Sequence, residues 1–294
     1  MIIVDYSQTI ISNLMAELNG QKDVDLEVDL LRHMVINTIR SHYTKFKDEY
    51  GELVIACDSK KYWRKEYFPY YKANRKKLRE ESGYNWNLIF DTINLLKQEL
   101  KDHFPYKVVE ILDAEADDII ASLCKWSQDN DLQLRGLIWE PKPVLIISGD
   151  HDFLQLQKYE NVSQYSPIQK KFVKATKKSS EIVLEHILKG DKGDGIPNVL
   201  TSDDSIVNGI RQKPLSSKKL SEWVGDPISM PRDDNFIRNF QRNKTLVDLS
   251  QIPSNVENEI LNTFTNLELK DKSLLLDYFI SHKMKNMIDL LEEF

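Results

Sequence analysis

Cysteine and long apolar runs are the two features that this sequence lacks most clearly. Among 294 residues there are only two cysteines, Cys57 and Cys124, which lie far apart and show no CxxC spacing. This scarcity argues against a disulfide scaffold and a thiolate metal site, and it is typical of a reducing cytoplasm. No apolar stretch approaches the roughly 20 residues of a membrane span, and no secretory leader is visible before the first apolar run. A cytoplasmic protein without a membrane segment is therefore expected.

An excess of positive charge is also absent. The 40 basic residues stand against 46 acidic ones, for a net charge of −6, and an acidic total argues against a nucleic-acid partner. The distribution of the charges along the chain nevertheless favours a nucleic-acid partner. Nine basic residues and a single acid lie between Lys60 and Arg79, and five lysines and no acid lie between Gln169 and Lys178. The cations are therefore concentrated in two segments.

Short apolar runs alternate with amphipathic segments along the first half of the chain. The runs occupy residues 2–4, 53–57, 108–112 and 144–147, and continuous β-branched runs are typical of strands that are covered on both faces. Helical spacing of apolar residues occurs over 28–46 and 86–100. Strands that alternate with helices predict an α/β protein with a mostly parallel sheet.

Carboxylates follow each of these four runs. They are Asp5, Asp58, the pair Asp150 and Asp152, and, beyond the run at 108–112, the group Asp113, Glu115, Asp117 and Asp118. In a parallel sheet these strand ends meet at one edge, where ligands bind. Taken alone, Asp113 predicts a helix cap and Asp118 a first-turn acid that the helix dipole favours.

A group of acids on one edge requires a cation, because like charges raise one another's pKa and destabilise the fold. Oxygen ligands without clustered histidine or cysteine favour Mg²⁺, for which Mn²⁺ can substitute. His151 lies between Asp150 and Asp152, but in an extended segment it would point to the opposite face. We therefore expect His151 not to be a ligand.

A further acidic pair, Asp191 and Asp194, lies in the glycine-rich stretch ILKGDKGDGIPNV. In isolation this is an ordinary Asp–Gly turn after a helix, with Gly190 just past the helix end. Next to a carboxylate edge, the pair is better interpreted as the completion of a two-metal site, with backbone N–H groups open to a phosphate. Two divalent ions about 3.5–4 Å apart suit in-line displacement at phosphorus.

The first basic segment predicts a nucleic-acid contact. YFPYYKANRKKLREESG has the pattern of one helix, with Pro69 near its first turn and Gly83 just past its end. On such a helix the cations share one face; they are Lys72, Arg75, Lys76 and Arg79. A basic face is usually only a solvated surface, but the aromatic residues interleaved with this one favour stacking on unpaired bases.

Five ordered blocks of the chain resemble the flap-endonuclease (5′-nuclease) superfamily, and its bacteriophage members in particular. The blocks are IVDYSQ, ACDSKKYWRKEYFPYYKANRKKLREES, DAEADDIIA, SGDHDFLQL and LKGDKGDGIPNV. The resemblance covers almost the whole chain. It implies a PIN-like nuclease domain over residues 1–178, with a helical gateway or arch over about 59–83. A smaller, mainly helical DNA-binding domain with a helix-turn-helix-type motif is implied over 179–294.

The resemblance also implies the site residues. The first metal site would use Asp5, Asp58, Asp117 and Asp150, and the second Glu115, Asp152, Asp191 and Asp194. The catalytic set would be Lys72, Arg75, Asp150 and Asp152, with the two cations on the scissile phosphate. Nucleic-acid contacts are expected from Arg64, Tyr71, Lys72, Arg75, Lys76, Arg79, Lys192 and Lys213. Tyr71 is expected to stack against a splayed base.

The activity that the resemblance implies is that of a Mg²⁺-dependent structure-specific 5′ nuclease with two metal ions. It would act as a 5′-3′ exonuclease and flap endonuclease that removes RNA primers and adjacent DNA during phage lagging-strand replication. The expected substrates are branched or nicked duplex DNA and RNA–DNA hybrids, which the enzyme would recognise by end geometry and backbone. A monomer is expected, and the suggested protein partners are the phage single-stranded-DNA-binding protein and sliding clamp.

Two other classes of function stay open from the residues alone. A non-catalytic protein that binds DNA junctions would share the basic face, and a Mg²⁺-dependent phosphatase would share the acids. The chain also departs from the superfamily after IPNV, where a turn of the form GIGxKT usually binds duplex phosphates and often potassium. Here LTSDDSIVN precedes GIRQKPLS, with Arg211 at the second glycine position. An altered duplex contact is therefore expected, without support for a potassium ion.

The two ends of the chain carry separate expectations. The sequence opens on the run at Ile2 without the leader that is associated with clamp binding in phage members, so no clamp contact is expected there. The terminal MIDLLEEF predicts a plain C-terminal helix, and the alternative is a short peptide that binds a partner.

Overall fold

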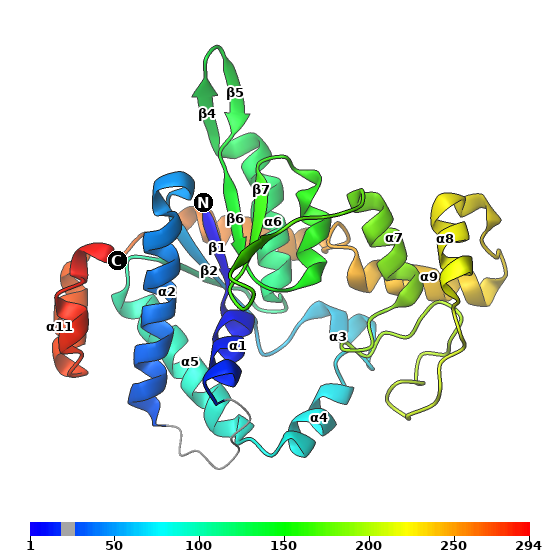
Figure 1. The fold of residues 1–294 in the computed structure, drawn as a ribbon, viewed down its shortest axis with the longest axis horizontal. Coiled ribbons are helices and arrows are strands. Elements are labelled where there is room, and N and C mark those ends of the chain that lie inside the picture. The colour runs from blue at the N-terminus through cyan, green and yellow to red at the C-terminus, as the bar shows by residue number, and fades with distance from the viewer. Residues whose placement is uncertain (19–26) are drawn as a thin grey trace.

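A six-stranded sheet lies at the centre of the computed structural model, which describes residues 1–18 and 27–294 (Figure 1). The strands are β1 (Ile2–Asp5), β2 (Leu53–Cys57), β3 (Lys107–Glu110), β6 (Val144–Ile147), β7 (Val162–Ser166) and β8 (Lys171–Val173). Their order is β3-β2-β1-β6-β7-β8, and all neighbours pair in parallel except β7 and β8. The predicted mostly parallel α/β sheet is confirmed, and each of the four predicted runs overlaps a strand.

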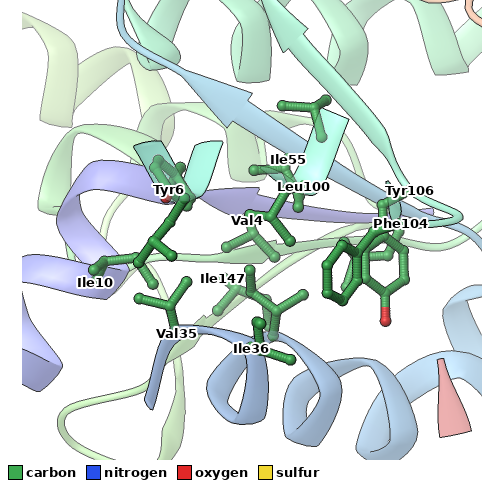
Figure 2. Close-up of a cluster of buried hydrophobic side chains, with 14 of the residues drawn as sticks. Val4, Tyr6, Ile10, Val35, Ile36, Ile55, Leu100, Phe104, Tyr106 and Ile147 are labelled. Carbon is green, nitrogen blue, oxygen red and sulfur yellow. The ribbon is translucent and has the colours of Figure 1, made fainter. Parts of the chain in front are cut away.

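Helices cover both faces of the sheet, as continuous apolar strands require. On one face lie α1 (Tyr6–Leu18), α2 (Val28–Tyr50) and α5 (Trp86–His103), and on the other lies α6 (Ala116–Asn130). Successive β1 side chains alternate between the two cores, with Val4 in the first and Ile3 in the second. Figure 2 shows Val4 and Ile147 of the sheet packed with Val35 of α2. This packing fixes the strand register and therefore the positions of the strand ends.

The last part of the chain first leaves the sheet and then returns to it. The helices α7 (Ser179–Lys189), α8 (Ser217–Gly225), η2 (Pro227–Ser229) and α9 (Asp234–Val247) lie around two small apolar clusters, one of which also contains Phe68 and Tyr71. α10 (Ser254–Asn266) then packs in the core beside α6, and α11 (Ser273–Ser281) in the core on the other face. α7 begins at the predicted domain boundary, but α10 and α11 complete the cores of the first part. The division at 178/179 stays a prediction.

The terminal MIDLLEEF does not form one plain helix. It contains the end of α12 (Lys285–Ile288) and the short η3 (Leu291–Glu293). The side chain of Phe294 is only 1% exposed, and its ring centroid lies 5.3 Å from that of Phe279 in the core. These apolar side chains are therefore buried by the chain itself.

The basic segment is not one helix, contrary to the prediction. α3 (Trp63–Tyr67) ends before Pro69, and α4 (Asn74–Ser82) begins only after a turn over residues 68–73. Within this turn Lys72 has a left-handed φ of 55°, and its N–H donates to the carbonyl of Asp194 at 2.7 Å. This tertiary bond replaces the helical bond that the pattern predicts. Gly83 ends α4 with a φ of 77°, as predicted.

Two further features lie outside the sheet and its covering helices. The hairpin of β4 (Leu132–Arg135) and β5 (Ile138–Pro141) projects beyond the amino ends of the strands (Figure 1). α7 and α8 pack against each other, but residues 190–216 connect them, a much longer link than the roughly 3–4-residue turn of a helix-turn-helix. Within the described part of the chain, no helix combines the length and apolar character that crossing a bilayer requires.

Candidate metal centre and nucleic-acid interface

The carboxyl edge of the sheet brings the predicted first set of acids together. Asp5 is the last residue of β1, Asp58 and Asp150 lie just beyond β2 and β6, and Asp117 lies in the first turn of α6. Burial, with the charges of Asp58 and Asp150, raises the pKa of Asp5 to about 7. Burial also raises the pKa of Asp117, and the charges of Asp150 and Asp5 add to this rise. The four carboxyl groups therefore interact strongly, as convergence of the strand ends requires.

Backbone hydrogen bonds hold these carboxylates in place. Asp5 accepts from the N–H of Gln8 at 3.2 Å and Asp58 from that of Ala116 at 2.9 Å. Asp150 caps η1 (His151–Lys158) by accepting from the N–H of Asp152 at 2.9 Å. Because η1 begins here, the segment after Asp150 is helical and not extended as the sequence analysis assumed.

A second group contains Asp152, Asp191 and a histidine that was not predicted. One ligand atom from each of Asp152, His186 and Asp191 lies within 4.8 Å of the others. The imidazole of His186 lies between the acids, with Nδ1 3.2 Å from Asp152 Oδ1 and Nε2 3.6 Å from Asp191 Oδ2. Burial raises the pKa of Asp152 to about 7, although His186 opposes the shift. The missed signal is helical spacing: His186 lies one turn before Gly190, which ends α7, so its side chain faces the turn that carries Asp191.

The protein's own cations engage the two remaining predicted metal ligands. Lys72 Nζ lies 2.5 Å from Glu115 Oε1 and 3.7 Å from Asp194 Oδ2. Arg75 also pairs with Asp194, and the hydroxyl of Tyr71 donates to Asp194 at 3.0 Å. Burial lowers the pKa of Lys72, but the charges of Asp194 and Glu115 outweigh it and raise the pKa overall. The predicted phosphate-binding cations thus lie directly against the acidic edge.

Arg64 and Tyr71 were predicted to contact nucleic acid, but neither residue lies at the surface. Both side chains are 2% exposed. Arg64 pairs with Glu115 and Asp118 at 2.8 Å each and donates to the carbonyl of Leu246 at 3.0 Å. A buried guanidinium with these partners has no surface for nucleic acid, and the buried ring of Tyr71 cannot stack on a base in this conformation. Both placements contradict the predicted contacts.

The start of α6 and the Asp191 turn bring two further corrections. Glu115 caps α6, in a capping box with Asp118, whereas Asp113 precedes the cap with a φ of 64°. Asp118 is therefore a first-turn acid, as predicted, but Asp113 is not the cap. The N–H groups of Gly193 and Asp194 donate to Asp191 Oδ1 at 2.7 and 3.1 Å. They are therefore engaged within the turn and not open to a phosphate.

A groove beside the acids combines cations with aromatic rings. Its volume is about 530 Å³, it lies between α4 and α5, and its lining includes Asp58 and Glu115. Its basic and aromatic lining residues include Lys60, Lys72, Arg75, Arg79, Tyr62, Trp86 and Phe90. The Arg79 guanidinium lies 5.4 Å from the centroid of the Phe90 ring. Phosphates and unpaired bases are the ligands that such a lining suits.

The remaining candidate residues lie on the surface. Lys76 is exposed on α4, where its Nζ is 4.0 Å from Glu80, and Lys192 and Lys213 are exposed on the connection from α7 to α8. All five lysines of the segment Gln169–Lys178 are exposed on β8 and its flanking loops. His151 is also exposed, beside Asp150 and Asp152. The nucleic-acid contacts of Lys76, Arg79, Lys192 and Lys213 stay predictions.

The acids fit divalent cations. The raised pKa values of Asp5, Asp117 and Asp152 mean that their charged forms are destabilised, and a bound cation relieves this penalty. The first set offers only carboxylate oxygens, the donors that Mg²⁺ and Mn²⁺ prefer, whereas the second also offers an imidazole. A parallel sheet with acids at its carboxyl edge, beside a basic and aromatic groove, defines an α/β protein with a candidate metal site and a candidate nucleic-acid interface.

Comparison with known proteins identifies the family. The profile described as "5′-3′ exonuclease, N-terminal resolvase-like domain" matches residues 2–186, and the one described as "T4 RNase H, C terminal" matches residues 178–294. The chain therefore belongs to the 5′-3′ exonuclease family. It is 32% identical to the Ribonuclease H of Enterobacteria phage T4 over 303 residues, which cover 99% of this chain and 95% of that protein. The predicted family resemblance is confirmed.

Two solved structures from bacteriophage T5 share the fold. The D15 protein co-crystallised with metal ions aligns with a TM-score of 0.60 at 19% identity, over 90% of this chain and 97% of that one. The 5′-exonuclease with bound zinc aligns with a TM-score of 0.64 at 18% identity, over 90% and 98%. With the family match, they confirm a PIN-like sheet domain followed by a helical C-terminal part.

Replacement of Arg64 tests whether this residue is structural. Arg64→Met leaves Asp118 and Glu115 buried without their guanidinium partner, so we expect the free energy of unfolding to fall by about 3–5 kcal/mol. Urea denaturation followed by circular dichroism measures the change. Arg135→Met, at a side chain that is 81% exposed, is the matched control and should change stability by less than about 0.5 kcal/mol. Equal small effects at both positions would contradict a structural role.

Replacement of Asp5 tests the repulsion among the acids. Because folding raises the Asp5 pKa from 3.8 to about 7, the folded protein holds a proton that the unfolded chain has released between those values. This group's contribution to stability therefore falls as pH rises through that window, and the full penalty is present at pH 8. Asp5→Asn should stabilise the protein in chelator at pH 8 by about 1–3 kcal/mol.

Divalent cations should stabilise the unmodified protein more than the Asp5→Asn variant. Added Mg²⁺ or Mn²⁺ should raise the melting temperature of the unmodified protein more than that of Asp5→Asn. Asp129→Asn, at an exposed acid of α6, should change neither result. Destabilisation by Asp5→Asn in chelator at pH 8 would contradict the repulsion.

Proposed function

We propose that this chain is a metal-dependent, structure-specific 5′ nuclease that hydrolyses phosphodiester bonds of DNA and of RNA–DNA hybrids. The observation that carries the proposal is the meeting of an acidic sheet edge with the cations Lys72 and Arg75 in a groove that aromatic rings also line. The acids suit metal ions, and the cations suit a phosphate. The groove accommodates the bases of an unpaired strand.

The carboxylates divide between two cation sites in this proposal. Asp5, Asp58, Asp117 and Asp150 would hold the first ion, and Glu115, Asp152, Asp191 and Asp194 the second, with Mg²⁺ as the physiological ion and Mn²⁺ as its substitute. When bound, the ions supply an activated water and stabilise charge at phosphorus. The catalytic set consists of Asp150 and Asp152 with Lys72 and Arg75.

Lys72 and Arg75 orient the scissile phosphate and stabilise the charge that develops on it. Both are held beside the acids by Asp194, and the 55° φ of Lys72 directs its side chain to the edge of the sheet. Because the raised pKa keeps Lys72 protonated, its charge is present before the substrate arrives. Such preorganised charge is what electrostatic catalysis requires.

In this proposal the enzyme selects its substrate by contacts to the nucleic-acid backbone and not by contacts to base edges. The groove offers cations and ring faces, which bind phosphates and stack on any base. An enzyme of this kind acts on branched or nicked duplexes with a free 5′ end or flap, and it removes RNA primers and adjacent DNA on the lagging strand of phage replication. Arg79, Lys76, Lys192 and Lys213 extend the phosphate contacts along the surface. Affinity therefore falls as salt rises.

The proposal places the enzyme as a monomer in the host cytoplasm, with the single-stranded-DNA-binding protein and sliding clamp as protein partners. A phosphatase would share the acids but has no use for a basic groove lined by aromatic rings. A non-catalytic junction-binding protein would not need every strand-end acid. The acids and the groove together favour the nuclease.

The decisive assay compares the unmodified protein with Asp150→Asn on a 5′-labelled flap and on a nicked RNA–DNA duplex. We expect label release with Mg²⁺ and none with chelator. Asp150→Asn should lose cleavage but keep most of its DNA affinity, because an amide oxygen can still cap η1 and the cations are unchanged. Release from a small phosphomonoester alone would support a phosphatase, and equal loss of binding and cleavage would contradict the division of roles.

Lys72 is predicted to act on the phosphate, whereas Lys77 has no role in the proposed site. Lys72→Ala should lower the single-turnover cleavage rate by about 10²–10³, the scale for one preorganised charge donor. Lys77→Ala, on the same segment but with a side chain that is 80% exposed, is the matched control and should change the rate by less than about tenfold. Similar rates for the two variants would reduce Lys72 to an ordinary surface cation.

A further inference from the structure

His186 lies at the acidic edge in a position that an all-oxygen metal site does not explain. Its ring stands between Asp152 and Asp191, with one nitrogen toward each, and one ligand atom from each of the three residues lies within 4.8 Å of the others. The residue comes from α7, whereas Asp152 comes from η1. Three segments of the chain therefore meet at this group.

The two nitrogens of His186 have different geometries. Nδ1 is 3.2 Å from Asp152 Oδ1, a separation at the outer range of hydrogen-bond distances. Nε2 is 3.6 Å from Asp191 Oδ2, which is too long for a hydrogen bond. Two ligand atoms that are each about 2.1 Å from one ion, at angles of roughly 90–115°, lie about 3.0–3.5 Å apart. The Nε2–Asp191 separation is close to that range.

This arrangement is typical of a histidine that binds a metal. A ligating imidazole usually donates its second N–H to a carboxylate, which fixes the tautomer and the ring orientation. Here Asp152 would accept from Nδ1, and the lone pair of Nε2 would face the ion beside Asp191. The acids also neighbour Asp150 and Asp194, whose charges act on Asp152, so the ion would lie in a strongly negative field.

We propose that His186 is a nitrogen ligand of the second cation site, through Nε2, and that it makes this site favour Mn²⁺ and related transition ions over Mg²⁺. Imidazole binds Mn²⁺, Co²⁺ and Zn²⁺ more readily than Mg²⁺, which prefers oxygen and water. The first site, with oxygen donors alone, lacks this preference. The inference rests on the proposed function, because it assigns a ligand to one of its two ions.

Pulsed electron paramagnetic resonance on the metal-free full chain reloaded with Mn²⁺ tests the ligand directly. We expect modulation from a directly bound ¹⁴N nucleus in the unmodified protein, its loss in His186→Gln, and its retention in His151→Gln. His151 is the matched control because it adjoins Asp150 and Asp152 but is exposed. Thermal unfolding in chelator checks that each variant is folded. If His186→Gln does not fold, His186→Asn is the second variant.

Metal affinities give an independent measurement. Mn²⁺ binding to His186→Gln should weaken by at least about tenfold at one site, while Mg²⁺, measured by competition, should weaken less. Bound Mn²⁺ without ¹⁴N modulation in the unmodified protein would overturn the inference, and so would equal losses for Mn²⁺ and Mg²⁺, which would make His186 only a charge partner. Absence of all divalent binding would instead contradict the proposed nuclease function.

Discussion

Repulsion among carboxylates at the carboxyl edge of the sheet is the constraint on which the rest of the structure depends. The apolar strands bring these acids close together and shield them partly from water, and each acid then destabilises the charge of its neighbours. The protein offsets part of this charge with its own cations, since Arg64 and Lys72 both pair with Glu115. Among the residues that the structure describes, neither Asp5 nor Asp117 forms an ion pair with a basic side chain, and burial with neighbouring carboxylates raises the pKa of both. A bound cation would relieve this imbalance of charge.

The same charge pairs also position the groove. Arg64 joins α3 to the start of α6 through Glu115, and its bond to the carbonyl of Leu246 adds α9. The turn over residues 68–73 is fixed against the Asp191 turn by Gly195, where a Cβ atom would lie 2.7 Å from the carbonyl of Tyr70. Only glycine permits this approach at a φ of 75°. The acids at the sheet edge therefore help to position the basic segment beside them.

The sheet and its acids could be predicted because their signals are local and periodic. A continuous apolar run predicts a buried strand. The strand before Asp5 can therefore be predicted from its own residues alone. The break in the basic helix could not be predicted, because it depends on the bond from Lys72 to Asp194, more than a hundred residues away. For the same reason, composition did not distinguish Arg64, a buried cation, from Lys76, an exposed one. His186 was missed because a lone histidine gains meaning only when α7 places it beside Asp191.

The pairing of Lys72 with Glu115 and Asp194 has a consequence for the order of events at the site. The backbone of Lys72 is held at the site, because its own N–H donates to the carbonyl of Asp194. In the proposed enzyme, a metal ion bound by the oxygens of Glu115 would release the ammonium group of Lys72 without moving this backbone. The released charge would lie beside the groove, where a phosphate oxygen is a suitable partner. The ion pair between Lys72 and Glu115 would therefore hold the cation in place until metal and substrate bind.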